Sequence, residues 1–533
     1  MTPARRVRAF GDSAVVVDVD GVDEAHGLAA VVDDDHRGGI EDVIVGFRSV
    51  TVVADPTVTD MVALGDLLAS MPASPTGRSA TRLVEIPVAL DGPDLDQVAD
   101  LAHLSPSRVV DLLTGTDLQV AFVGFAPGFA YLVGLPPDLA SVPRRPTPRP
   151  AVPGGSVALA GGFAGVYPQT SPGGWHLVGR TGMRLFDPGS PPYSTLRAGD
   201  LVRLRTAEVP GAAPSTQGRR SLRSDSDRRV VVESAGLLSL VQDGGRRGVA
   251  ALGVPRAGAA DPYALRVANR LVGNADGAAA IETTARGPTL RFTAPAHVAV
   301  VGTAELTIDG RSVPGDAPVP VGAGQTLVTG DEHRGLRSYV AVSGGIDIPA
   351  VLGSRSSDVL CGLGPGPLVR GDVLGLGWPG RPGGRRRADA PGVVVPLRVV
   401  VGPDAFPTTT VDRLVSTTWT VDPSSDRIGV RLWSEEPLTT GTPEVASRGM
   451  VTGAIQLPPD GRPIVLLCDH ATVGGYPVIA TVVSADLGAL GQLRPGAAVR
   501  VEPVDLSEAV RARSVREQWV RDAVIGWYPV RSD

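Results

Sequence analysis

The alternation of apolar and polar residues predicts a chain of many short strands with a few helices between them. Residues 14–19, 43–47 and 50–53 are rich in valine and isoleucine, as strands are. Residues 59–71 instead repeat their apolar side chains at helical spacing. The pattern therefore predicts a small α/β module over residues 1–80, which a stretch rich in proline and glycine brings to an end.

A second module is predicted over residues 81–206. It opens with a strand, and residues 94–102 have helical spacing. Residues 105–115 begin with the Ser-Pro order of an N-cap followed by proline, which predicts another short helix. Short strands and turns follow, a pattern typical of a closed or nearly closed β-barrel. Residues 207–228 have no apolar periodicity and are predicted to be a flexible linker.

Two further barrels are predicted beyond the linker, over residues 229–380 and 395–506. Three modules end in a similar turn followed by a last strand, at residues 198–202, 370–374 and 494–501. Such turns are common, but three of them at module ends favour related barrels.

Two helices are predicted in this second half. One is capped by Asp261-Pro262 and stops at Gly273-Asn274. The other belongs to the C-terminal segment 507–533, comprising a helix and a tail. Its predicted buried residues are Val510, Val515, Trp519 and Val520.

Composition narrows the class of protein. A chain of 533 residues with 43% apolar and 20% charged residues is expected to form several globular domains. No apolar run is long enough to span a bilayer, and the N-terminus has no secretory pattern, so we expect no membrane partner and a cytoplasmic location. A net charge of −6 without a long basic run argues against a nucleic-acid partner.

All 50 basic residues are arginine, and this absence of lysine excludes several kinds of chemistry. A lysine-containing P-loop, a Schiff base and a covalently attached biotin or lipoyl group all require lysine. The seven histidines are scattered and Cys361 and Cys468 lie far apart, so no metal site is predicted. Both cysteines are expected in the core.

The densest group of candidate site residues lies in residues 124–181, where aromatic, arginine, hydroxyl and glycine residues alternate. This composition suggests a pocket for a small anionic or amide-bearing ligand, because arginine binds carboxylate or phosphate through a planar fork. The alternative is a β-barrel whose tight turns are rich in glycine and proline. The candidates are Arg144 and Arg149 as a clamp, Ser156 as an anion contact, Tyr167 and Trp175 as a pocket floor or as core, and Arg180.

A second group lies in the C-terminal half. Asp469 and His470 follow a buried-looking run at residues 464–468, which suits general acid–base catalysis, although a structural pair is equally compatible. A tight loop follows these two residues. Gln242, Asp243 and Arg246 could form a polar cluster with Glu282, or a structural salt bridge. The remaining candidates are Ser354, Arg355 and Ser356 as an anion contact, and Thr472, Gly474, Gly475 and Tyr476 in the tight loop.

Both halves resemble components of a known enzyme. The motifs GFAPGFAYL, RRPTPRPAVPGGSVALAGG and YPQTSPGGWHLVGRT, within residues 5–206, resemble the B subunit of prokaryotic 5-oxoprolinase, a KipI-like or allophanate-hydrolase-subunit-1 protein. The motifs VQDGGR, ANRLVGN, SDRIG, GAIQLP and DHATVGGYP, within residues 229–506, resemble its KipA-like C subunit, the allophanate-hydrolase-subunit-2 family.

The resemblance implies a fold and an activity. The fold is mainly β with α/β: a small N-terminal α/β domain and cyclophilin-like β-barrels, one in the B half and two in the C half. The activity is ATP-dependent hydrolysis of the lactam of 5-oxo-L-proline to L-glutamate, with magnesium expected and with a separate A-type (LamB/YcsF-like) subunit. The pocket is expected between the B-like and C-like barrels. A homo-oligomer is possible, and the motifs add Ser171, Arg427 and Gln456 to the candidates.

Two alternatives remain open. One is a KipI/KipA-type regulator that binds a sensor histidine kinase. The other is a carboxyltransferase module like those of urea amidolyase and allophanate hydrolase, which would need a biotin carrier on another chain because this one has no lysine.

Overall fold

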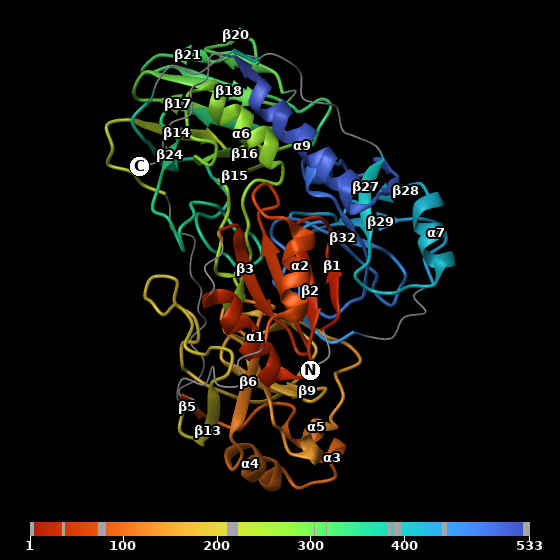
Figure 1. Cartoon of the computed structure of the whole chain (residues 1–533). Helices are drawn as coiled ribbons and strands as arrows, with labels where there is room; N and C mark the ends of the chain where they lie inside the picture. Colours follow the sequence, from red (N-terminus) through yellow and green to blue (C-terminus); the bar gives the residue numbers. More distant parts are fainter. Residues whose placement is uncertain are drawn as a thin grey trace.

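The computed structural model describes residues 5–34, 38–72, 82–209, 222–302, 304–315, 317–380, 385–386, 396–439 and 445–525. Residues 210–221, most of the predicted linker, therefore lie outside the described part of the chain. As predicted, the fold is mainly β with a few helices and with nearly closed, barrel-like sheets (Figure 1).

The N-terminal module is an antiparallel sheet of order β1-β2-β4-β3. The helix α2 begins after Asp60, whose side chain accepts hydrogen bonds from two backbone N–H groups. Helix α1 was not predicted, because the valines beside it favour strands; its Ala25, Leu28 and Val32 nevertheless enter the module's core. The elements are β1 (Val7–Ala9), β2 (Ala14–Asp18), α1 (Val22–Asp34), β3 (Ile40–Val45), β4 (Ser49–Ala54) and α2 (Met61–Ser70).

The second module is a seven-stranded sheet of order β12-β9-β10-β7-β6-β13-β5. Its first and last strands in sequence, β5 and β13, pair in parallel. Ser105 caps α4 and Gly115 ends it, as predicted. The elements are β5 (Leu83–Val88), α3 (Leu95–Leu101), α4 (Pro106–Thr114), β6 (Leu118–Val123), β7 (Ala130–Val133), α5 (Pro137–Ala140), β8 (Arg149–Val152), β9 (Ser156–Ala160), β10 (Phe163–Val166), β11 (Ser171–Gly173), β12 (His176–Arg180) and β13 (Leu201–Thr206).

The third module packs a seven-stranded sheet against a five-stranded sheet. Along β18, Val298 and Val300 face the core between the sheets, whereas Ala299 and Val301 contact the group that includes α6. Asp261 caps α6, as predicted. The elements are β14 (Arg229–Ser234), β15 (Leu238–Gln242), η1 (Ala250–Leu252), α6 (Pro262–Leu271), β16 (Ala280–Thr284), β17 (Thr289–Phe292), β18 (Ala296–Val301), β19 (Leu306–Ile308), β20 (Arg311–Ser312), β21 (Val319–Val321), β22 (Thr326–Thr329), β23 (Arg337–Val342), β24 (Ile346–Asp347) and β25 (Val373–Leu376).

The fourth module is an eight-stranded sheet in which the early strand β27 and the late strand β36 again pair in parallel. The elements are β27 (Leu397–Val401), α7 (Thr408–Ser416), β28 (Trp419–Val421), β29 (Gly429–Trp433), β30 (Arg448–Gly449), β31 (Ala454–Gln456), β32 (Ile464–Leu466), β33 (Val473–Gly474), β34 (Val478–Val482), η2 (Ser484–Asp486), α8 (Leu487–Gly491), β35 (Ala498–Val499) and β36 (Val501–Pro503). A short pair, β26 (Arg385–Arg386) with β37 (Val524–Ile525), lies outside this sheet.

The C-terminal helix α9 (Leu506–Asp522) corrects one prediction. Val510 and Val515 are exposed, by 42% and 71%, although both were predicted to be buried. The buried face consists instead of small residues, Ala509 and Ala512, together with Arg513 and Val520. Alanine lets the helix lie close to η2 and β27, which turns the two valines toward solvent. In Figure 1, α9 runs between α6 and β27 and so joins the third and fourth modules.

The N-terminal module lies in the middle of the molecule, between the second module below and the third module above (Figure 1). Asp12 joins it to the fourth module and to α9, because its carboxylate accepts hydrogen bonds from Ser484 and Arg513. On another side, Phe47 N–H donates to the carbonyl of Ser447 at 2.8 Å. The first 200 residues therefore contact the C-terminal half directly, independently of the covalent connection.

Candidate functional site

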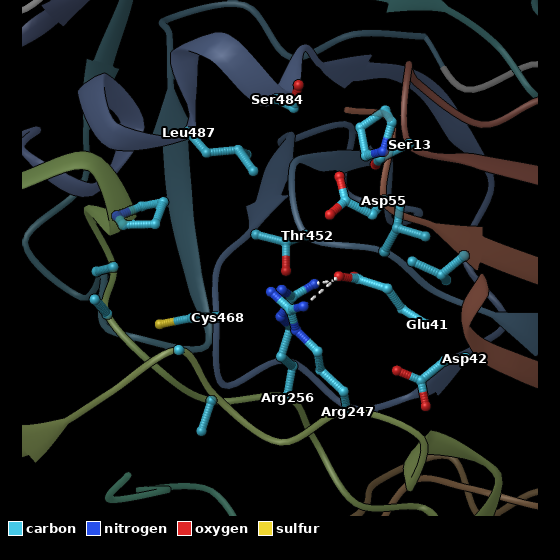
Figure 2. Close-up of a pocket in the computed structure, with 18 of the residues that line it drawn as sticks. Ser13, Glu41, Asp42, Asp55, Arg247, Arg256, Thr452, Cys468, Ser484 and Leu487 are labelled. Carbon is cyan, nitrogen blue, oxygen red and sulfur yellow. Dashed lines mark hydrogen bonds and ion pairs between the residues drawn. The ribbon is translucent and has the colours of Figure 1, made fainter. Parts of the chain in front are cut away.

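A cavity of about 440 Å³ lies where the N-terminal module meets both modules of the C-terminal half (Figure 2). Ser13 and residues 41–57 form one wall, residues 243–277 a second and residues 450–487 a third, with two side chains of α9 completing the lining. The pocket was predicted between the barrels of the two halves. The B half does contribute to it, but through its small N-terminal sheet and not through its barrel.

Two arginines from the third module face a glutamate from the N-terminal sheet inside this cavity (Figure 2). Arg256 Nη1 lies 2.6 Å from Glu41 Oε2, and Arg247 Nη1 lies 3.1 Å from Glu41 Oε1. The side chain of Glu41 is only 9% exposed, whereas those of Arg247 and Arg256 are 55% and 37% exposed. The arginine pair thus presents guanidinium groups to the cavity, with one protein carboxylate in contact with both.

The cavity also holds two aspartates whose pKa values move in opposite directions. Burial raises the pKa of Asp42 to about 6, with the N–H group of Ala250 and the charge of Arg256 opposing the rise. Burial also acts on Asp55, but hydrogen bonds from Thr57 outweigh it, and the pKa of Asp55 is lowered. One carboxyl group is therefore suited to exchange a proton near neutral pH, and the other stays ionised.

His470 and Thr472 supply polar atoms from the third wall. His470 Nδ1 lies 2.8 Å from the carbonyl oxygen of Ala471, which can only accept, so Nδ1 carries the hydrogen and Nε2 is left as an acceptor. Burial lowers the pKa of His470, which keeps the ring neutral. Thr472 Oγ1 is buried and has no hydrogen-bond partner among the described residues. An unsatisfied hydroxyl on a cavity wall is a natural contact for a polar ligand.

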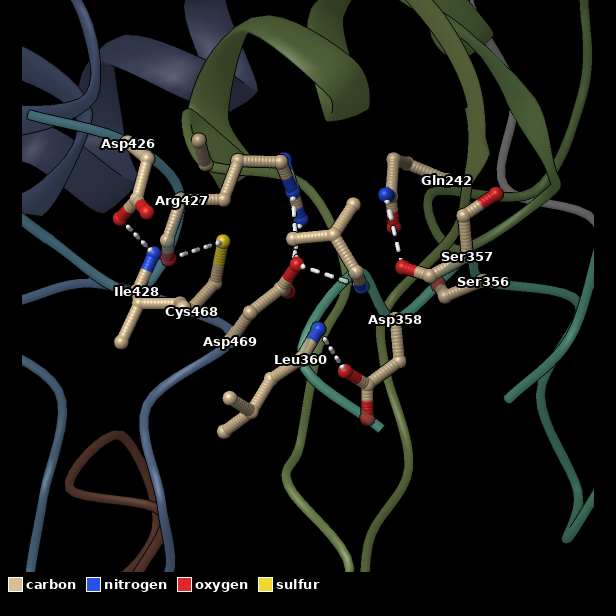
Figure 3. Close-up of polar contacts among 12 residues, drawn as sticks. Gln242, Ser356, Ser357, Asp358, Leu360, Asp426, Arg427, Ile428, Cys468 and Asp469 are labelled. Atoms are coloured by element: carbon tan, nitrogen blue, oxygen red, sulfur yellow. Dashed lines mark hydrogen bonds and ion pairs between the residues drawn. The ribbon is translucent and has the colours of Figure 1, made fainter. Parts of the chain in front are cut away.

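Asp469 is not among the residues that line this cavity, whereas His470 beside it is. Asp469 lies instead in a buried network of polar contacts (Figure 3). Both Asp469 oxygens lie 3.0 Å from the guanidinium of Arg427, which also contacts Glu282 and the carbonyl of Gly258. Tyr339 OH donates to Glu282 at 2.7 Å. Despite burial, Arg427 and Arg337 lower the pKa of Glu282. The predicted Asp469–His470 pair is thus divided between a buried ion network and the cavity.

Asp243 is the centre of a second buried network, at the end of β15. Its carboxylate accepts from Ser354 Oγ at 2.6 Å, from Ser356 Oγ at 2.5 Å and from the backbone N–H of Arg355 at 2.6 Å. Arg246 donates to the carbonyls of Val351 and Ser356, and Gln242 to that of Ser357 at 3.0 Å. These residues gather around the loop at 351–357. Glu282, predicted to join them, pairs instead with Arg427.

Residues 124–181, all of which the structure describes, contribute nothing to the lining of this cavity. Arg149 forms two hydrogen bonds to Asp94, at 2.9 and 2.7 Å, and Arg180 pairs with Asp91. The rings of Phe125, Phe129, Tyr131, Phe163, Tyr167 and Trp175 pack against one another, most of them edge to face. The arrangement is that of a packed aromatic core with paired arginines at its rim.

The beginning of the same stretch contacts the other half of the chain. Gly128 N–H donates to the carbonyl of Leu252 at 2.9 Å. A Cβ atom at Gly124 would lie 2.3 Å from a Val473 methyl, and one at Gly253 would lie 2.4 Å from the carbonyl oxygen of Ala126. Glycine is required at these two positions by close packing between the halves.

The other predicted residues lie apart from the cavity lining. Ser171 Oγ is buried without a partner among the described residues, Gln456 contacts the Met450 sulfur, and Gly474 lies beside Gln456. The positions that remain are Arg144, which is exposed, Ser156, which is buried in β9, and Gly475 and Tyr476, which lie in the loop after β33.

Of the predicted residues, Asp243, His470 and Thr472 line the cavity, together with Cys468, which was expected in the core. The sequence reasoning missed Glu41, Asp42, Arg247 and Arg256. The two acidic residues come directly before a predicted strand, and Arg247 follows the quoted motif that ends at Arg246. Those local signals were present, but only the fold places them opposite one another.

Across the described residues, no group of three or more histidine, cysteine, aspartate or glutamate side chains is arranged to hold a metal ion. Nor does that part of the chain contain a helix long and apolar enough to cross a membrane. Cys361 and Cys468 are both buried and free, as expected of core cysteines.

Family models for carboxyltransferase subdomains match both halves of the chain. The model for carboxyltransferase domain subdomains C and D matches residues 5–196, and the model for subdomains A and B matches residues 252–503. The chain belongs to the families of the 5-oxoprolinase B and C subunits, which it joins in one polypeptide.

Each half of the chain has relatives of the matching subunit type. The 5-oxoprolinase C subunit from Escherichia coli K12 is 36% identical over 296 residues, which are 54% of this chain and 94% of the relative. The 5-oxoprolinase B subunit from Bacillus subtilis 168 is 36% identical over 228 residues, 38% of this chain and 93% of the relative. The crystal structure of TTHA0988 superposes with a TM-score of 0.84 at 34% identity, covering 93% of this chain and all of that one.

Part of the chain is also similar to part of a larger enzyme. Urea amidolyase from Saccharomyces cerevisiae is 33% identical over 307 residues, which are 51% of this chain and 16% of the relative. The structure of the Kluyveromyces lactis urea amidolyase gives a TM-score of 0.51 at 27% identity, over 59% of this chain and 22% of that one.

Proposed function

We propose that this chain is the fused B–C component of an ATP-dependent 5-oxoprolinase, which hydrolyses the lactam of 5-oxo-L-proline to L-glutamate together with a separate A-type subunit. The observation that carries the proposal is the cavity built by both halves, with an arginine pair from one half facing carboxyl groups from the other. A substrate with a carboxylate and an amide matches these two kinds of group. The family membership of the two halves agrees with it.

The cavity residues suggest how such a substrate would bind. Arg247 and Arg256 would bind its carboxylate in place of Glu41, since guanidinium groups pair with carboxylates through charge-assisted hydrogen bonds. Thr472 would hydrogen-bond a polar atom of the ring, because its hydroxyl is otherwise unsatisfied. His470 Nε2 would accept a proton from the attacking water, since the ring is neutral and Nδ1 is held by a carbonyl.

The chemistry of the substrate explains why the reaction would require ATP. A lactam is an unreactive amide, and phosphorylation of its oxygen would turn the ring carbon into an effective electrophile. With no lysine in the chain, arginine, hydroxyl and backbone N–H groups are what this polypeptide could offer to a phosphate. Magnesium would come with the nucleotide, bound largely by its phosphates.

The decisive assay mixes the purified chain with a candidate A-type subunit, ATP and 5-oxoproline, and measures glutamate and ADP. Authentic separate B and C subunits with the same A-type subunit serve as the positive control. Formation of both products in equal amounts is the expected result. Failure to form either, under conditions in which the separate subunits are active, would overturn the proposal.

Arg256→Ala tests the substrate site. Removing a charged hydrogen-bond partner is expected to raise KM for 5-oxoproline about 10- to 100-fold. The unfolding free energy should change little, because Arg256 is partly exposed and Glu41 keeps Arg247. Arg291→Ala is the matched control, since Arg291 forms a comparable exposed pair with Glu233 in the third module. An unchanged KM in Arg256→Ala would remove this arginine from the site.

A further inference from the structure

Strand β3 contains an irregularity that brings two successive carboxylates to the same cavity. Ile40 lies opposite Ala54 and Asp42 opposite Val53, so Glu41 is an extra residue without a partner on β4. In a regular strand, successive side chains point to opposite faces of the sheet. A bulge breaks that alternation, and here both Glu41 and Asp42 line the cavity (Figure 2).

The two carboxylates have different partners. Glu41 contacts both arginines, whereas Asp42 Oδ1 accepts a hydrogen bond at 2.9 Å from the backbone N–H of Ala250, the first residue of η1. This bond comes from the other half of the chain and fixes the orientation of Asp42. The orientation therefore depends on contact between the halves.

The ionisable groups around Asp42 come from every wall of the cavity. Glu41 precedes it on β3, Asp55 follows β4, Arg247 and Arg256 line the same cavity from the third module, and His470 lies on the third wall. Burial, reinforced by the negative charge of Glu41, outweighs Arg256 and raises the pKa of Asp42 to about 6. Both the protonated and the ionised form are accessible near neutral pH.

We propose that Asp42 is the general acid that protonates the ring nitrogen as the lactam C–N bond breaks. This rests on the proposed function, and it assigns a catalytic residue to the B half while the arginines that bind the substrate belong to the C half. Neither half alone contains the complete site.

The proposed step balances as follows. ATP transfers its terminal phosphoryl group to the lactam oxygen and leaves as ADP, and a first water adds to the ring carbon while His470 accepts one of its two protons. The C–N bond then breaks, its electron pair goes to nitrogen, and the carboxylic acid of Asp42 supplies a proton to that nitrogen. The hydroxyl group left by the water loses its proton to solvent as it becomes the carbonyl of the acyl phosphate. Asp42 is then reprotonated from solvent, and His470 releases its proton to solvent. A second water hydrolyses the resulting acyl phosphate, which yields the glutamate side-chain carboxylate and inorganic phosphate.

Asp42→Asn tests this role without removing the anchor, because the amide oxygen can still accept from Ala250 N–H. In the assay with the A-type subunit, we expect kcat to fall at least 100-fold while KM for 5-oxoproline stays within about threefold. In the wild type, kcat/KM should decrease as the pH rises through about 6, where free Asp42 loses its proton. That decrease should be absent from the residual activity of Asp42→Asn.

The controls separate the possible failures. Asp96→Asn, in an exposed position of α3, should leave activity unchanged. Calorimetry measures the Kd of 5-oxoproline for Asp42→Asn, and a Kd equal to that of the wild type shows that the binding site is intact. Asp42→Glu keeps a carboxylic acid at this position and should therefore recover part of kcat. If the wild type is active and Asp42→Asn has the same kcat, Asp42 is not the general acid, while the proposed function stands. If the wild type is inactive under conditions in which the authentic B and C subunits are active, both the proposed function and the role of Asp42 are overturned.

Discussion

Residues 124–181 and the cavity between the halves contain similar kinds of side chain in different surroundings. In the first region, Arg149 and Arg180 are paired with aspartates of the same module, and the aromatic rings fill one another's space. In the second, Arg247 and Arg256 face a cavity and share a carboxylate that comes from the other half of the chain. Residue type alone does not distinguish these two situations.

The difference lies in where the partners come from. Asp91 and Asp94 belong to the same module as the arginines that they bind, so those pairs stabilise one folded unit. Glu41 and the cavity arginines come from different modules and lie about 200 residues apart in the sequence. A cavity with a few polar groups on a largely apolar wall remains where the modules meet, as is common at interfaces between domains.

The largest expected effect concerns the ion network behind the cavity. Arg427→Ala leaves Asp469 and Glu282 buried without their shared guanidinium, and these side chains are 0% and 1% exposed. The unfolding free energy is expected to fall by about 3–5 kcal/mol, as when one partner of a buried pair is removed. Denaturant unfolding measures this, and a loss below about 1 kcal/mol would mean that the network does not hold the cavity wall in place.

Arg149→Ala addresses the other side of the comparison. Asp94 is 6% exposed and would lose two hydrogen bonds while keeping those from Leu177 N–H and Arg145. We expect a loss of about 1–3 kcal/mol in unfolding free energy and no change in KM for 5-oxoproline. Arg184→Ala, at an exposed pair with Asp187, is the control and should cost less than about 0.5 kcal/mol. A tenfold rise in KM without a loss of stability would show that residues 124–181 bind substrate after all.

Asp358→Asn should produce a smaller and opposite effect. Burial, reinforced by Asp469, raises the pKa of Asp358 from 3.8 to about 6. Between these pH values the folded chain keeps a proton that the unfolded chain has lost, so stability falls as the pH rises. The Asp358→Asn side chain does not ionise, so the stability of this variant does not fall for that reason. It should match the wild type below pH 4 and exceed it by on the order of 1–2 kcal/mol above pH 6, as measured by unfolding across pH.

The fold was largely predictable because its signals are local. Ser105-Pro106 and Asp261-Pro262 start helices where expected, and the valine-rich runs form strands. Helix α9 shows the limit of such reasoning. Its valines are exposed because the neighbouring elements meet an alanine face, and nothing within the helix sequence identifies which face they meet.

The site was less predictable, for a physical reason. Glu41 and Asp42 face the same cavity because of a bulge, and a bulge depends on the partner strand β4 as much as on β3. Asp469 and His470 are adjacent in sequence, yet one enters an ion network and the other a cavity wall. Such assignments require knowledge of which modules meet, which the periodicity of a single segment does not contain.

The parallel pairs β5–β13 and β27–β36 bear on how the protein folds during synthesis. Each joins strands that lie more than a hundred residues apart, near the beginning and the end of one sheet. A nascent chain cannot form either pair until the late strand has left the ribosome, and contacts between distant segments form slowly. Until then β5 and β27 each have an edge without its final partner. We therefore expect translation pauses or truncations just before residues 201 and 501 to be the points at which this chain is most prone to aggregate.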